Sequence, residues 1–112
     1  MNWEVVYLPE AEKDLSKLDN SVRLQVLKGI QKVQTNPLPK QQGGYGTPLG
    51  NKNGTNLTSF MKIKFRGLGV RVVYRLEFSK TEMKIIVISA REDNEAYREA
   101  ARRIEKDLLG TE

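Results

Sequence analysis

The chain has 112 residues, a formal net charge of +5, and neither cysteine nor histidine. The missing residues exclude disulfides, thiolate metal sites and the usual acid/base group near neutral pH. The length predicts a single domain, 1–112, and the positive charge favours a polyanionic partner. No apolar run approaches the length of a membrane span and no leader-like segment precedes Trp3. We therefore expect a cytoplasmic protein without a membrane anchor.

The N-terminal third of the chain predicts a strand followed by two helices. WEVVYL, residues 3–8, is β-branched and aromatic, as is typical of strands. PEAEKDLSKL, residues 9–18, begins with a proline that suits a first helical turn, and its apolar residues recur at helical spacing. Asn20 or Ser21 can cap a second helix, whose apolar stripe runs to about Thr35. The pair predicts an αα-hairpin.

The middle of the chain, residues 36–59, loses all periodicity and is rich in glycine, proline and asparagine, which predicts a long irregular loop. Its glycines do not have the spacing of a phosphate-binding loop. Strands then resume at about 60–66, 70–77 and 84–90, and a helix covers about 93–109. The order β-α-α-β-β-β-α predicts an α+β domain with a mainly antiparallel sheet.

The hairpin FMKIKFRGLGVRVVYRLEF, residues 60–78, has the most informative pattern. Because side chains alternate across a strand, Lys62 and Lys64 share one face while the apolar residues share the other. A two-residue turn at 67–68 places Lys64 opposite Arg71 on the charged face, and the other register would mix charged and apolar faces. Like charges directly opposite each other destabilise a strand pair by up to about 1 kcal/mol. Folding therefore gains nothing from this arrangement.

Two interpretations of the charged face remain open. Isolated lysines on a strand commonly keep a sheet edge soluble. Here the cations cluster on two adjacent strands, and no acidic residue appears in the hairpin before Glu77. The pattern favours a face that binds an anion, and phosphate suits it because an arginine forks onto phosphate oxygens while lysines add point charges.

A family resemblance rests on MKIKFRGLGVRVVYRLE, on the strand KIIVIS and on AREDNEAYREAARRI. Together these resemble the RelE toxins, which are ribosome-dependent mRNA endonucleases of bacteria within the RelE/ParE superfamily. The resemblance implies a RelE-like fold and an active site of two lysines in a K-x-K strand, an arginine in the next strand, and an arginine and a tyrosine at the last helix. By position, the implied catalytic residues are Lys62, Lys64, Arg71, Arg91 and Tyr97. The implied RNA-binding residues are Lys62, Lys64, Arg66 and Arg75.

Residues near the last helix also have structural interpretations. Arg91 directly follows a strand, where an arginine commonly caps an element or forms an ion pair. Tyr97 lies on the apolar stripe of the helix and suits a core aromatic residue. The resemblance favours a functional role for both. Arg102 and Arg103 are interpreted as solvated helix charges or as additional RNA contacts.

The resemblance also implies a reaction and partners. In the family, a ribose 2′-hydroxyl attacks the adjacent phosphate and leaves a 2′,3′-cyclic phosphate and a free 5′-hydroxyl, with no metal or other cofactor. The target is mRNA on the ribosome, and an antitoxin encoded alongside covers the basic face or displaces the last helix in a hetero-oligomer. Three alternatives stay open: a ParE-like toxin that poisons DNA gyrase, a non-catalytic RNA- or ribosome-binding module, and an inactive toxin that keeps the fold.

Overall fold

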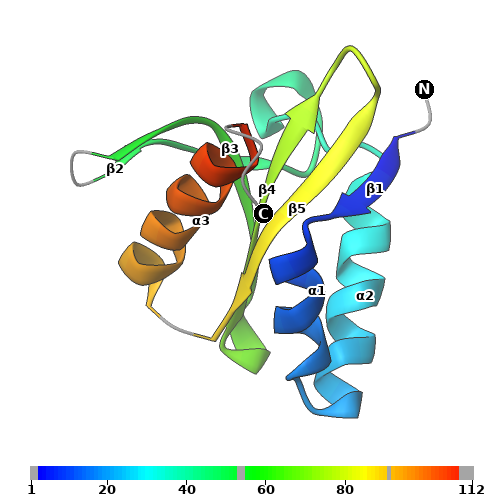
Figure 1. Ribbon diagram of the computed structural model, residues 1–112. Coiled ribbons are helices and arrows are strands. Elements are labelled where there is room, and N and C mark those ends of the chain that lie inside the picture. Colours follow the sequence, from blue (N-terminus) through cyan, green and yellow to red (C-terminus); the bar gives the residue numbers. More distant parts are fainter. Residues whose placement is uncertain (1–2, 53–54, 91, 109–112) are drawn as a thin grey trace.

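The computed structural model of the chain describes residues 3–52, 55–90 and 92–108. Its helices and strands are β1 (Glu4–Tyr7), α1 (Pro9–Ser16), α2 (Asn20–Gln34), β2 (Thr47–Lys52), β3 (Thr55–Phe65), β4 (Val70–Glu77), β5 (Glu82–Ser89) and α3 (Asp93–Leu108). The sheet has the order β1-β5-β4-β3-β2, and only the β1–β5 pair is parallel. Helix α3 crosses one face of the sheet, while α1 and α2 lie at the other (Figure 1). The predicted α+β class with a mainly antiparallel sheet is confirmed.

One strand lies where the sequence predicts an irregular loop. Within 36–59, β2 pairs with β3 at the edge of the sheet, and the pairing shifts between Pro48 and Gly50. The prediction is therefore wrong for 47–52 and 55–59, whereas 36–46 contains a short 3-10 helix and turns. Glycine, proline and asparagine are poor strand formers, so the local pattern has no strand period. The open edge of β3 supplies the hydrogen bonds that the composition does not predict, and an edge strand tolerates proline.

The αα-hairpin forms as predicted and contributes much of the core. Pro9 occupies the start of α1, and Asp19 precedes α2 in the capping position that the sequence analysis gave to Asn20 or Ser21. Helix α2 approaches β3 closely, because a β-carbon on Gly29 would overlap the ring of Phe65. No helix in 3–52, 55–90 or 92–108 is both long and apolar enough to cross a membrane.

A buried tyrosine attaches the loop after α2 to the sheet. The hydroxyl of Tyr74 in β4 donates a hydrogen bond of 2.8 Å to the carbonyl oxygen of Pro37. Gly46 lies against the same hydroxyl, since a β-carbon there would come within 2.5 Å of it. Burial raises the pKa of Tyr74, so the hydroxyl stays a donor throughout the physiological range. This contact holds the loop against the strand that carries Arg71.

We expect Tyr74→Phe to lower the free energy of unfolding by about 1–2 kcal/mol, because the buried Pro37 carbonyl loses its donor. Tyr45→Phe, on the same loop but 47% exposed, is the matched control and should change stability by less than about 0.5 kcal/mol. Urea unfolding followed by circular dichroism measures both. Equal losses from the two variants would contradict the anchoring role of Tyr74.

Candidate functional site

Strand pairing brings three polar side chains into one row across the sheet. Lys64 of β3 lies opposite Arg71 of β4, and Arg71 lies opposite Ser89 of β5. Lys62 occupies the same face of β3, roughly 7 Å from Lys64 along the strand. The predicted register and the placement of Lys62, Lys64 and Arg71 on one face are confirmed, but the connection is a 3-10 turn at Arg66–Leu68 and not the predicted two-residue turn. The sequence analysis missed Ser89, because only the β4–β5 register shows that it joins this row.

Helix α3 covers the same face and carries Tyr97 to it. Tyr97 is 4% exposed, and the ammonium group of Lys62 lies 5.9 Å from the centre of its ring. A cation at this distance from an aromatic ring is attracted by the negative face of the ring. Tyr97 is thus a core aromatic residue and also a neighbour of the lysine pair. The interpretation as a core residue is confirmed, and the functional role of Tyr97 stays a prediction.

The remaining predicted residues lie elsewhere. Arg66 is exposed in the 3-10 turn Arg66–Leu68, beyond the end of β3. Arg75 is partly buried opposite Phe60 of β3, roughly 13 Å along β4 from Arg71. Arg91 lies outside the described residues. The structure therefore groups Lys62, Lys64, Arg71 and Tyr97, and leaves Arg66 and Arg75 at a distance.

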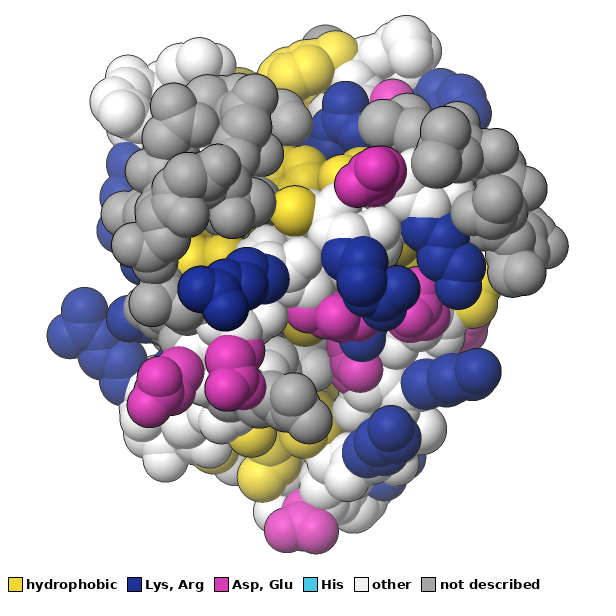
Figure 2. Space-filling view, turned by 60° about the vertical axis from the view of Figure 1, so that its left-hand side comes forward, with side chains coloured by type: hydrophobic (Ala, Val, Ile, Leu, Met, Phe, Trp, Pro, Cys, Tyr) yellow, Lys and Arg dark blue, Asp and Glu magenta, His cyan; other side chains and the backbone are white. Residues whose placement is uncertain are grey.

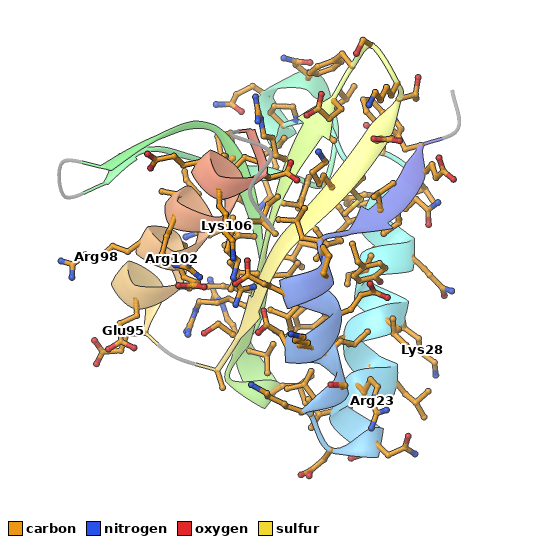
Figure 3. The ribbon with its side chains drawn as sticks, in the orientation of Figure 1. Arg23, Lys28, Glu95, Arg98, Arg102 and Lys106 are labelled. Atoms are coloured by element: carbon orange, nitrogen blue, oxygen red, sulfur yellow. The ribbon has the colours of Figure 1, made fainter. Side chains whose placement is uncertain are left out.

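Charge is divided unevenly along the sequence. Between Asp19 and Glu77 the chain has ten lysine and arginine residues and no acidic residue. This interval forms α2, β2, β3 and β4, and its three strands are neighbours in the sheet. On α2, Lys28 is exposed, while Arg23 is partly buried and donates a hydrogen bond of 3.2 Å to the carbonyl oxygen of Leu18 (Figure 3). By contrast, acidic and basic side chains are interleaved on the side of the molecule that α3 occupies (Figure 2). The basic interval thus supplies three neighbouring strands, and α3, which packs on β3, β4 and β5, brings acidic side chains to the same side of the molecule.

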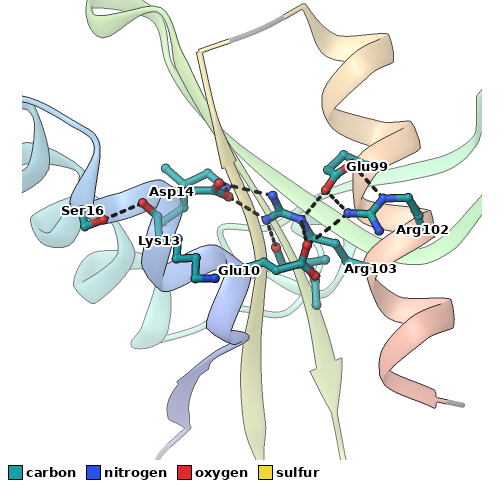
Figure 4. A network of polar contacts seen from close by, with 9 residues as sticks. Glu10, Lys13, Asp14, Ser16, Glu99, Arg102 and Arg103 are labelled. Atoms are coloured by element: carbon teal, nitrogen blue, oxygen red, sulfur yellow. Dashed lines mark hydrogen bonds and ion pairs between the residues drawn. The ribbon is translucent and has the colours of Figure 1, made fainter. Parts of the chain in front are cut away.

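A polar network joins α3 to α1, and it corrects one interpretation from the sequence. Arg103 is 9% exposed and is not a solvated helix charge. Its guanidinium donates hydrogen bonds of 2.7 and 3.2 Å to Asp14 of α1 and one of 2.6 Å to Glu99 (Figure 4). The neighbouring Arg102 is exposed, as predicted, and binds Glu99 and Glu10. The sequence carries no sign of this difference, because the two arginines are adjacent on one helix.

The open edge of β5 explains why Arg103 is buried. Tyr7, the last residue of β1, lies opposite Ile85, and no described strand covers that edge of β5 further on. Between the pairs Tyr74–Ile85 and Val73–Val87, β5 has one extra residue, Ile86, which forms a β-bulge. Buried backbone groups need partners. The carbonyl oxygen of Ile86 accepts a hydrogen bond of 2.9 Å from Arg103.

Asp14, on the other side of the sheet, binds a second backbone group of this edge. One of its carboxylate oxygens accepts a hydrogen bond of 3.0 Å from the backbone N–H of Ile88. The same oxygen binds Arg103 at 2.7 Å. A cavity of about 520 Å³ lies beside the network, and its lining includes Asp14, Arg103 and Ser89. The cavity therefore extends from the network to the end of the polar row.

The network also changes the titration of Glu99. Its pKa falls from the usual 4.5 to about 2, chiefly because Arg102 donates hydrogen bonds to the carboxylate, with a further contribution from Arg103. Burial acts in the opposite direction and is outweighed. The carboxylate of Glu99 is therefore ionised throughout the physiological range. Among the described residues, no group of three or more acidic side chains is placed to hold a metal ion.

The chain was compared with family models, with curated proteins and with solved structures. No family model matches the chain. In sequence, the chain is 26% identical over 104 residues to an Escherichia coli protein named as a RelE-like toxin, and the match covers 93% of this chain and 99% of that protein.

Solved structures give the same result. A free arginine-to-alanine double mutant of the E. coli toxin RelE superposes with a TM-score of 0.74 at 28% identity, covering 93% of this chain and 99% of that one. Isolated E. coli RelE gives 0.66 at 27% identity, covering 91% and 98%. The intact E. coli RelBE toxin–antitoxin complex gives 0.61 at 26% identity, covering 80% and 98%. The chain is RelE-like in sequence and in fold, and the resemblance is confirmed.

The low pKa of Glu99 predicts a specific acid sensitivity. Because the pKa is lower in the folded state than in the unfolded chain, ionised Glu99 stabilises the fold above about pH 4.5. This contribution is lost as the pH falls toward about 2. We expect Glu99→Gln to reduce the loss of stability between about pH 5 and about pH 2.5, measured by urea unfolding. Glu105→Gln, exposed on the same helix, is the control and should keep the wild-type pH dependence. An unchanged profile for Glu99→Gln would contradict the prediction.

Proposed function

We propose that this protein is the toxin of a type II toxin–antitoxin system and that it cleaves mRNA in the ribosomal A site. The observation that carries the proposal is the row of Lys62, Lys64 and Arg71 on one sheet face with Tyr97 beside it. An arginine forks onto phosphate oxygens and lysines add point charges, so this set of side chains suits a phosphate ligand. The likeness to E. coli RelE, which is named a toxin, supports the same function.

The proposed reaction is attack of a ribose 2′-hydroxyl on the adjacent phosphate. Arg71 forks onto the phosphate oxygens and stabilises the charge that develops on them in the transition state. Lys62 and Lys64 add positive charge or transfer a proton. Tyr97 orients or deprotonates the 2′-hydroxyl, and Arg91 faces the leaving oxygen as a charge, since its pKa is too high for easy donation. This chemistry requires no metal and no protein nucleophile.

Dependence on the ribosome agrees with the weak acid/base groups of the site. Lysine, arginine and tyrosine have pKa values well above neutrality in water, so they are poor proton carriers at physiological pH. An enzyme built from them gains most of its rate from a substrate that is already held in a reactive geometry. The hydroxyl of Tyr97 is buried in the structure. In the proposal, an RNA phosphate draws the flexible lysine side chains toward it and uncovers this group.

We propose an antitoxin as the second partner. The E. coli relative has been solved in complex with RelB and also with a RelB peptide. The interval 20–76, which has no acidic residue, supplies basic side chains for an acidic partner to bind. An acidic or amphipathic antitoxin segment that covers the cation row would block RNA and form a hetero-oligomer in the cytoplasm.

Cell-free translation of a defined mRNA tests the proposed activity. We expect cuts within codons, mapped by primer extension, only while the mRNA is being translated. Arg71→Ala should lower the cleavage rate about 100- to 1,000-fold, because a transition-state contact to the phosphate is lost. Lys80→Ala is the matched control, since Lys80 is an exposed cation in the turn between β4 and β5. Intact mRNA and unaffected translation would overturn the proposal, and inhibition of gyrase in a parallel assay would identify a ParE-like toxin.

Tyr97→Phe separates catalysis from binding. Removing only the hydroxyl should lower the single-turnover cleavage rate about 100-fold or more, because the group that orients or deprotonates the 2′-hydroxyl is gone. Ribosome binding, measured by cosedimentation, should stay unchanged. Tyr7→Phe in β1 is the control. A binding module would instead tolerate Tyr97→Phe and lose affinity gradually with salt.

A further inference from the structure

The pair formed by Arg103 and Asp14 is more buried than the other ion pairs described between α3 and α1, Arg102–Glu10 and Arg103–Glu10. Both side chains are largely buried, with 10% and 16% of their surfaces exposed. Arg103 donates to both carboxylate oxygens of Asp14, and this two-point contact defines direction as well as distance. Each member also binds the backbone of β5, at Ile86 and at Ile88. The pair therefore ties α3 to a defined position on the sheet.

The apolar face of α3 provides few features that would fix that position. Among the side chains of α3 that the structure describes, the buried apolar ones are Ala96, Tyr97, Ala100 and Ile104, and two of these four are alanine. Small side chains interdigitate little with a sheet, so they hold a helix against it without strongly opposing rotation or sliding. The polar pair resists both movements, because its hydrogen bonds break when the helix turns or shifts.

The position of the Tyr97 side chain is set by the same helix. Tyr97 lies six residues before Arg103, roughly 9 Å along the helix axis, and a helix of this length moves as one rigid element. The contact between the Tyr97 ring and Lys62 exists only in the observed rotation of α3. A turn of the helix about its axis would move the ring away from the cation row, at the cost of the apolar contacts that Tyr97 itself makes.

We infer that Arg103 is a positioning residue: through Asp14 and the β5 edge, it fixes the rotation of α3 that keeps Tyr97 at Lys62. The inference rests on the proposed function for its effect on cleavage. Arg103 acts through the helix and contacts no reacting group. The carboxylates that face its guanidinium are Asp14, Glu10 and Glu99, from both helices.

The position of Tyr97 can be followed without any cleavage assay. The chain has four tyrosines, so protein labelled with 3-fluorotyrosine should give four fluorine NMR signals, and Tyr97→Phe identifies the signal of Tyr97. We expect Arg103→Met to shift or broaden this signal and to leave the other three in place. Asp14→Asn is a milder second variant, which keeps an oxygen acceptor for Ile88 and removes the charge. Arg98→Met is the matched control, because Arg98 points away from the sheet on the same helix (Figure 3).

Cleavage kinetics on translating ribosomes give the second measurement. Arg103→Met and Asp14→Asn should lower kcat at least tenfold and leave KM within about twofold, because RNA binding is retained and Tyr97 is misplaced. Arg98→Met should match the wild type. An unmoved Tyr97 signal with normal kcat in both variants would overturn the inference, as would a rise in kcat. If the wild type cleaves no mRNA, the proposed function fails, and the fluorine signal alone decides whether Arg103 positions Tyr97.

Discussion

The open edge of β5 is the constraint on which the arrangement of the helices depends. Strand β1 is too short to cover it, and the bulge at Ile86 turns a buried carbonyl outward. Backbone groups in such a place must be satisfied, and Arg103 and Asp14 supply the partners. Burying two charges costs desolvation energy that their attraction only partly offsets, yet removing one partner typically costs about 3–5 kcal/mol. The backbone groups of this edge thus require Arg103 and Asp14 as hydrogen-bond partners. The ion pair between these two residues in turn links the helices on the two faces of the sheet.

On the sheet face under α3, by contrast, charges of the same sign lie opposite each other. Lys64 and Arg71 lie directly across from each other, an arrangement that weakens the strand pair. Ion pairs concentrate at the α1–α3 contact, where they support the fold. The cations of this row come from the interval between Asp19 and Glu77, which has no acidic residue of its own.

The likeness to E. coli RelE covers 93% of this chain. At 28% identity, most side chains differ between the two proteins. Shared strand order and helix placement bring the lysines, Arg71 and Tyr97 together, although they are far apart in the sequence. The site is therefore a property of the sheet register and of the rotation of α3. Its geometry depends on the surrounding fold as much as on the identity of its side chains.

The elements with a regular side-chain period could be predicted from the amino-acid sequence alone. The alternation of apolar and basic residues predicted the β3–β4 register and hence the pairing of Lys64 with Arg71, because a slip by one residue would bury charge. Helical spacing likewise predicted α1, α2 and α3. Only the tertiary structure decided the features that depend on a distant partner: strand β2, which forms on the edge of β3, and Ser89, which the β5 register adds to the row. It also decided that Arg103 is buried while Arg102 is exposed, since the unfilled edge of β5 lies beneath only one of them.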